Sequence, residues 1–151
     1  MGSSASGLRI VLASLAVLAL CGCGSSSLSS TQLRQDATRI CATASRRTDR
    51  IATPTSPAQS GQFLAQGAAA LEPQLKALTA LRPPSDAARV YATALRADSA
   101  ELSALRATAR QLDVGDDPVS AISSLQRRLG PSESRANAAW HSLAIPACVN
   151  R

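Results

Sequence analysis

The stretch ARVYATALRADSAELSALRATARQL, residues 88–112, decides the fold that this sequence predicts. Its larger apolar residues recur at steps of three, four or seven, which is the spacing of one face of an α-helix. The heptad core positions are occupied by Ala88, Tyr91, Leu95, Leu102, Leu105, Ala109 and Leu112. A heptad series is typical of a helix that packs lengthwise against other helices, so this stretch predicts one long helix of a bundle.

The same helical periodicity continues on both sides of this stretch, and no strand-like alternation appears. Ser29 and Gln32 have the spacing of a capping box at the start of a first helix, and Ser56 and Gln59 repeat that spacing at the start of a second. The sequence therefore predicts two helices before residue 82.

Proline and glycine mark the remaining boundaries. Residues 82–84 (RPP) form a turn, and Ser85 is the expected N-cap of the long third helix. A last helix should start at residues 116–118 (DDP) and end before Pro146. Because residues 130–131 (GP) interrupt its apolar stripe, we expect it to be kinked or broken there.

Short connections between long amphipathic helices make sequential helices antiparallel. The predicted fold is therefore all-α, an up-down-up-down four-helix bundle over residues 29–151 with the last helix kinked or broken near Gly130 and Pro131. Asp98 occupies the one polar slot in the heptad series of the third helix. It could be a buried carboxylate in a pocket, but we expect a side chain at the edge of the seam that reaches water or pairs with an arginine.

The N-terminal residues 10–20 (IVLASLAVLAL) are continuously apolar but number only about half of the roughly twenty that span a membrane. A run of this size after a basic residue is typical of a signal peptide. It ends in Leu20-Cys21-Gly22-Cys23, which resembles the lipobox of bacterial lipoproteins, where the modified cysteine carries acyl chains and becomes the new N-terminus.

Cys23 is the expected lipidation site, because modification of Cys21 would place the bulky Leu20 directly before it. The expected organisation is a lipoprotein signal peptide over residues 1–22, a flexible tether over 23–28 and the helical domain over 29–151. A transmembrane anchor and an ordinary secreted protein are the alternatives. The expected location is the outer face of a bacterial cell membrane, or the periplasmic side where an outer membrane exists.

The chain is basic, with sixteen Lys and Arg against ten Asp and Glu. Such a balance favours nucleic acid, anionic lipid or an acidic partner. Nucleic acid is disfavoured because the protein is expected to be exported, and because Phe63, Tyr91 and Trp140 are the only aromatic residues on which bases could stack. The sequence also contains no zinc-finger or helix-turn-helix spacing.

The first helix carries the densest positive charge of the chain. Its arginines are candidate contacts to lipid headgroups, and the alternative is that they form the solvated face of an amphipathic helix. These residues are Arg34, Arg39, Arg46, Arg47 and Arg50.

Two cysteines, Cys41 and Cys148, remain after signal-peptide removal. An even pair in an exported chain indicates a disulfide. Zinc binding is the rival, but the single histidine, His141, has no cluster of ligands around it in the sequence.

No motif for catalysis or for a cofactor or metal is visible. His141 lies in no triad or Glu-x-x-His pattern, and the sequence contains neither a nucleophile elbow, a haem-attachment motif nor a phosphate loop. The sequence therefore predicts a non-enzymatic structural or interaction module, anchored in the membrane by its lipid, that contacts an envelope protein or polymer. The alternative is a carrier of a lipid-like small ligand in a cavity between the helices.

Three features together resemble small helical lipoproteins and secreted proteins of high-GC bacteria, a group without an assigned activity. They are the early Cys41, the turn Leu81-Arg82-Pro83-Pro84 and the late Cys148. The resemblance implies fold and location and carries over no chemistry.

Overall fold

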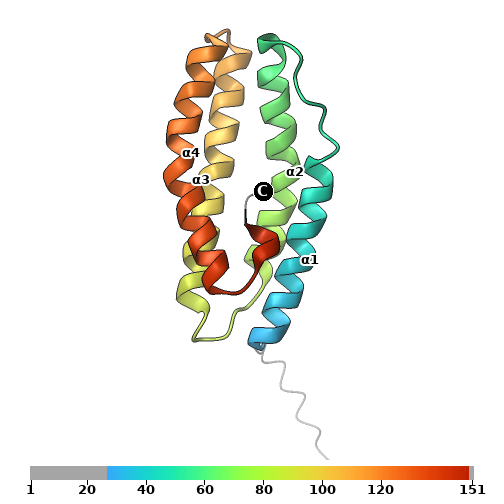
Figure 1. Cartoon of the computed structure of the whole chain (residues 1–151), viewed down its shortest axis with the longest axis vertical. Coiled ribbons are helices and arrows are strands. Elements are labelled where there is room, and N and C mark those ends of the chain that lie inside the picture. The colour runs from blue at the N-terminus through green and yellow to red at the C-terminus, as the bar shows by residue number, and fades with distance from the viewer. Residues whose placement is uncertain (1–26, 150–151) are drawn as a thin grey trace, which may run out of the picture.

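The computed structural model describes residues 27–149, and it confirms the predicted all-α bundle within that range. Helix α1 packs against α2, α2 against α3 and α3 against α4, and the four run up and down along one long axis (Figure 1). Their bounds are α1 Ser30–Thr48, α2 Ser60–Ala80, α3 Ala88–Asp113 and α4 Pro118–Ser142, with short 3₁₀ helices η1 at Pro57–Gln59 and η2 at Pro146–Cys148. The predicted signal peptide and Cys23 lie outside the described residues.

Two helix starts form as their sequences predict. At α1 the backbone N–H of Gln32 donates to Ser29 Oγ at 3.2 Å, and the backbone N–H of Ser29 donates to Gln32 Oε1 at 2.9 Å, which completes the capping box. At α4 the backbone N–H of Ser120 donates to Asp117 Oδ2 at 2.8 Å. That bond lowers the pKa of Asp117 below its usual value because it stabilises the ionised carboxylate.

The second predicted capping box, between Ser56 and Gln59, does not form. Ser56 makes no side-chain cap, and Gln59 Oε1 instead accepts from the backbone N–H of Thr55 at 2.7 Å and from its hydroxyl at 3.1 Å. The side chain of Gln59 therefore reaches one residue further back, and the intervening turn is η1, so α2 begins only at Ser60.

The predicted cap at Ser85 is also wrong. Helix α3 begins at Ala88 with Ala87 as its N-cap, and the carboxylate of Asp86 accepts from the backbone N–H of Ala87 at 2.9 Å. A serine three residues before the first helical residue is too early to cap it, and the nearer carboxylate binds the exposed N–H instead.

Helix α4 is continuous through Gly130 and Pro131, so the broken form of this helix is not adopted. Helix α2 likewise continues through Pro73. All three residues are exposed. The carbonyl that loses its helical partner at each proline can therefore be solvated, which makes the interruption tolerable.

The chain turns back directly after α4. Ala144 adopts a positive φ of 55°, and η2 then packs against both α4 and α1, so that it closes the side of the bundle between them (Figure 1). This return brings Cys148 into a disulfide with Cys41, with their Cα atoms 5.2 Å apart. The predicted pairing of Cys41 with Cys148 is confirmed.

The core contains a large cluster at the end of the bundle where the chain enters α1, and a smaller one around Leu64 and Leu125. In the large cluster the rings of Tyr91 and Trp140 meet edge to face, with centroids 5.6 Å apart. The hydroxyl of Tyr91 donates to the carbonyl of Leu78 at 2.6 Å. The contact between the two rings packs α3 against α4, and the hydrogen bond of the hydroxyl links α3 to α2.

Candidate functional site

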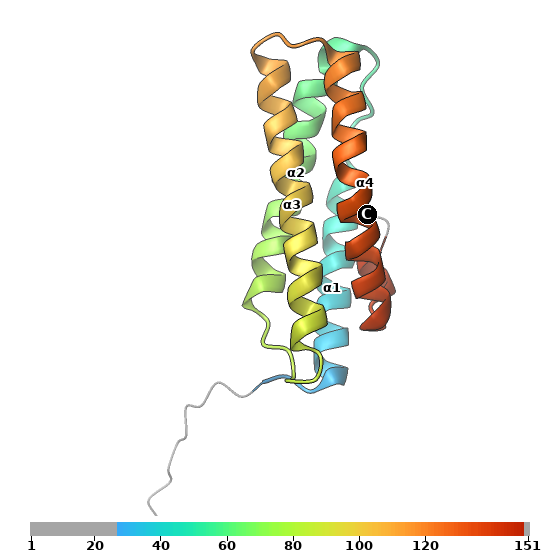
Figure 2. The same ribbon diagram turned by 90° about the vertical axis from the view of Figure 1, so that its left-hand side faces the viewer.

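A groove of about 730 Å³ runs between α3 and α4 on the side that faces away from α1 and α2. Figure 2 views this side, where the two helices lie next to each other in front. Its floor on α3 is made of small side chains, and Ser132 contributes from α4. The floor residues on α3 are Thr93, Ala97, Ala100, Ala104 and Ala107.

Three arginines border the groove. Arg96 Nη2 donates to Thr93 Oγ1 at 3.2 Å, Arg128 Nη2 to Thr108 Oγ1 at 2.7 Å, and Arg135 Nε to the carbonyl of Pro131 at 3.1 Å. These acceptors are neutral, and no Asp or Glu occurs among the residues that line the groove. The groove therefore carries concentrated positive charge, and an anionic ligand is the complement that it fits.

Asp98 does not have the surroundings that we expected. Its side chain is 6% exposed, and Trp140 Nε1 donates to its Oδ1 at 3.4 Å, so it is a buried carboxylate rather than one at the solvent edge. The reason is the packing of α4 on α3, which places the indole over this position. The burial of Tyr91, together with the nearby charge of Asp98, raises the pKa of that tyrosine well above its usual value.

A small interior pocket borders Asp98. It measures about 40 Å³ and is also lined by Glu101 and by Gln74, whose Nε2 donates to Cys41 Sγ at 3.3 Å. Pockets for small organic ligands occupy about 300–1,000 Å³. This pocket suits a water-sized occupant and cannot hold a lipid-like molecule.

The start of the described chain is fixed at one end of the bundle. The backbone N–H of Leu28 donates to the carbonyl of Arg82 at 2.8 Å, which pins residues before α1 to the turn between α2 and α3. Arg34 lies at this same end, where it shares a surface pocket with Asp86 and Leu143. We call this the tethered end.

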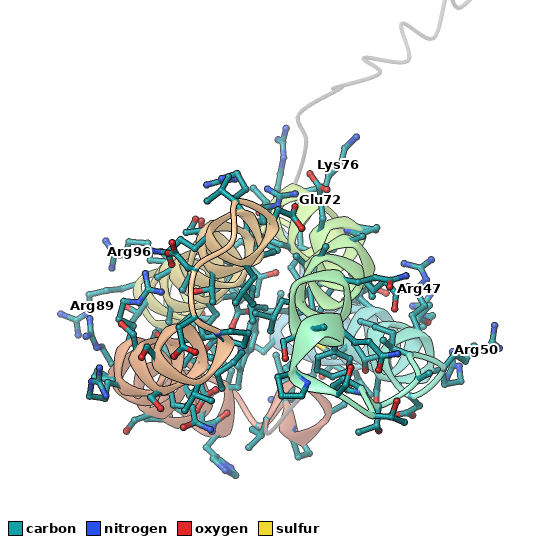
Figure 3. All side chains as sticks on the ribbon, turned by 90° about the horizontal axis from the view of Figure 1, so that it is seen from above. Arg47, Arg50, Glu72, Lys76, Arg89 and Arg96 are labelled. Atoms are coloured by element: carbon teal, nitrogen blue, oxygen red, sulfur yellow. A yellow bond between two sulfur atoms is a disulfide. The ribbon has the colours of Figure 1, made fainter. Side chains whose placement is uncertain are left out.

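The other arginines predicted to contact lipid lie progressively further from the tethered end. They are exposed, and Arg39 forms an ion pair with Asp36 one helical turn earlier. Arg47 and Arg50 point to solvent on the side of the bundle opposite the α3–α4 groove (Figure 3). The fold therefore does not gather these residues with Arg34 into one compact site. His141 is exposed near the end of α4.

None of the described helices is long and apolar enough to cross a membrane. Over residues 27–149, no group of three or more His, Cys, Asp or Glu side chains could hold a metal ion. Comparisons with models of protein families, with curated proteins and with solved structures give no match.

The sequence did not predict the groove, because the apolar heptad face of the third helix contains none of the residues that line it. A second seam is nevertheless visible in that helix: Thr93, Ala97, Ala100, Ala104 and Ala107 follow one another at steps of four, three, four and three. This is also a heptad pattern, made of small residues. It was the signal that could have pointed to a second contact face.

Proposed function

We propose that this protein is a non-enzymatic interaction module of a bacterial cell envelope, anchored to the membrane by acyl chains on Cys23, with the α3–α4 groove as its contact surface. The groove carries the proposal, because it is a concave surface of one charge sign to which the described chain supplies no covering element. Surfaces of this kind are typical of sites where a partner of opposite charge docks.

The position of the tethered end supports this role. Because Leu28 is held against the turn that contains Arg82, a lipid at Cys23 would attach at one end of the long axis. The groove lies along the side of α3 and α4, so anchoring would leave it accessible to a neighbouring molecule in the envelope (Figure 2). This arrangement suits a presented surface better than a surface covered by the membrane.

A carrier of a lipid-like ligand is the competing function. The interior pocket beside Asp98 holds about 40 Å³, well below the volume that such a ligand requires. The α3–α4 groove has the volume, but it is open to solvent and bordered by three arginines, which does not suit an apolar ligand. Ala94 and Ala136 in the core are fully or almost fully buried, and small side chains of this kind let helices pack closely. The tight packing around these residues favours the interaction module.

Two measurements test the proposal separately. Mass spectrometry of the protein purified from envelopes should find a diacylated N-terminal Cys23, and Cys23→Ala should move the protein out of the membrane fraction. A photo-crosslinking residue at Ala100, on the groove floor, should give a discrete adduct in intact envelopes. The same residue at Ala69, exposed on α2, serves as the control. Equal adducts from both positions would argue against the groove as the contact surface.

A further inference from the structure

We infer that the groove between α3 and α4 binds an acidic amphipathic helix of a partner protein. This inference deepens the proposed function, and it rests on that function only in taking the groove as a contact surface. It names the shape and the charge of the partner, and both follow from the residues of the groove.

The floor points to a helix. Its five small residues repeat with the four-three spacing of a coiled-coil seam from Thr93 to Ala107, a length of about 21 Å at 1.5 Å per residue. A seam of alanine allows the backbone of another helix to approach closely, and a helix in a groove between two others repeats the packing of a bundle. An extended anionic polymer would not require this periodicity.

The flank of the seam sets the charge of the partner. Arg96 and Ser103 directly precede the seam residues Ala97 and Ala104, and Arg89 and Arg110 continue the same interval of seven beyond the two ends of the seam; all four are exposed. In a coiled coil these are g positions, whose charges select a partner of opposite sign. Figure 3 shows Arg89 and Arg96 pointing away from the bundle on this side.

Helix α4 supplies positive charge on the other edge of the groove. Arg128 contacts Thr108, and Arg96 lies twelve residues before Thr108 on α3, so these two arginines are separated by about 18 Å along the groove. Arg135 lies seven residues after Arg128 on the same helix. A partner helix with acidic side chains on both flanks over three turns or more would meet all three.

A second copy of this chain fits the groove poorly. A two-fold dimer across it would place the same surface of each copy against the other, so that Arg96, Arg128 and Arg135 would face arginines. Like charges at contact distance repel. A flat lipid surface would reach the arginines at the rim but leave the recessed floor around Ala100 and Ala104 uncovered.

The test uses the protein purified from envelopes in neutral detergent and a fluorescent peptide of about 18 residues. The peptide is locked as a helix by a staple on its outer face, with alanine at its seam positions and glutamate on both flanks. We expect saturable binding that weakens with added salt. The substitutions Arg96→Gln, Arg128→Gln and Arg135→Gln together should weaken it at least tenfold.

The matched control removes the same charge from the opposite side of the molecule: Arg46→Gln, Arg47→Gln and Arg50→Gln together should change binding less than twofold. Ala100→Gln with Ala104→Gln should weaken binding by obstructing the floor, whereas Ala65→Gln with Ala69→Gln on the exposed face of α2 should not. Circular dichroism of each variant verifies that the bundle is intact.

Three results would overturn the inference. The first is equal binding of a peptide with the same composition whose helix is broken by two prolines. The second is equal binding of the peptide with glutamine in place of glutamate. The third is tighter binding of polyphosphate or anionic vesicles than of the acidic helix. None of these results bears on acylation of Cys23, so failure of this inference and failure of the membrane anchor can be told apart.

Discussion

Cys148 lies 107 residues after Cys41, yet their Cα atoms are 5.2 Å apart and their sulfur atoms are bonded. The bond holds η2 against α1, on the side of the bundle where α1 and α4 are bridged by this short helix. A cross-link over so long a loop stabilises the fold mainly because it restricts the unfolded chain.

Removal of this disulfide should therefore destabilise the folded protein. We expect Cys41→Ala with Cys148→Ala to lower the free energy of unfolding by about 4–5 kcal/mol, the chain-entropy value for a loop of this length. Urea denaturation followed by circular dichroism measures the change, and reductant should shift the wild type towards the variant. An unchanged urea midpoint in the double variant would show that the tail is not needed to hold the bundle.

Alkaline pH should unfold the protein through Tyr91. Burial, with the charge of Asp98 as a second cause, raises the pKa of this tyrosine in the folded state above its unfolded value of about 10. The stabilisation is therefore complete below about pH 10 and is lost as pH rises further, because only the unfolded chain ionises readily.

The measurement is simple because Tyr91 is the single tyrosine. Tyrosinate absorbance should appear together with loss of helical circular dichroism, at a pH above the normal tyrosine range. Tyr91→Phe should remove this contribution to the alkaline slope of stability. Its lost bond to the Leu78 carbonyl, which still accepts from the backbone N–H of Leu81, should lower stability by about 0.5–1.5 kcal/mol at neutral pH. Ionisation near pH 10 in a fully helical protein would contradict the prediction.

Two glycines of α2 should respond to alanine in opposite ways. A Cβ at Gly67 would meet nothing within 4 Å, so Gly67→Ala should stabilise the protein by about 0.5–1 kcal/mol through helix propensity. A Cβ at Gly61 would lie 3.1 Å from Leu112 Cβ, so α3 must shift to accept it. Urea midpoints of both variants test this, and an equal gain at Gly61 would show that the two helices separate without cost.

Features that depend on neighbouring residues could be predicted from the sequence, and features that depend on tertiary packing could not. The cap at Ser29 and the long helix through residues 88–112 were predictable because each depends on residues within a few turns of one another. The burial of Asp98 was not predictable, because it depends on Trp140, which is 42 residues away in sequence and reaches Asp98 only after α4 folds back on α3.

The groove illustrates the same limit. Its alanine seam can be read from the sequence, but the seam is informative only once the topology shows that no described element covers it. Arg128 and Arg135 join the site from α4 through tertiary packing, and nothing in the sequence near Arg96 points to them. Local sequence patterns predicted the helices, whereas the groove arises from the packing of α3 against α4.

The tethered end gives the last prediction, which concerns the arginines expected to contact lipid. Arg34 lies four residues after Ser30, the first residue of α1, whereas Arg46 and Arg47 lie sixteen and seventeen residues after Ser30. At 1.5 Å per residue they are about 25 Å further along α1 than its first residue. Electrostatic attraction to a lipid surface falls off within a Debye length of about 8 Å at physiological salt.

Arg89 also lies at the tethered end, because it is the second residue of α3, directly after the turn that contains Arg82. If the anchored bundle stands upright on this end, Arg34 and Arg89 should contact anionic headgroups and Arg46 and Arg47 should not. We expect Arg34→Gln with Arg89→Gln to weaken the binding of non-acylated protein to anionic vesicles by about 1 kcal/mol for each charge at low salt. Arg46→Gln with Arg47→Gln removes the same charge and should leave binding nearly unchanged. Co-sedimentation with anionic and with neutral vesicles measures both pairs. A larger loss from the second pair would mean that α1 lies flat along the membrane, and equal losses would mean that only net charge attracts the protein.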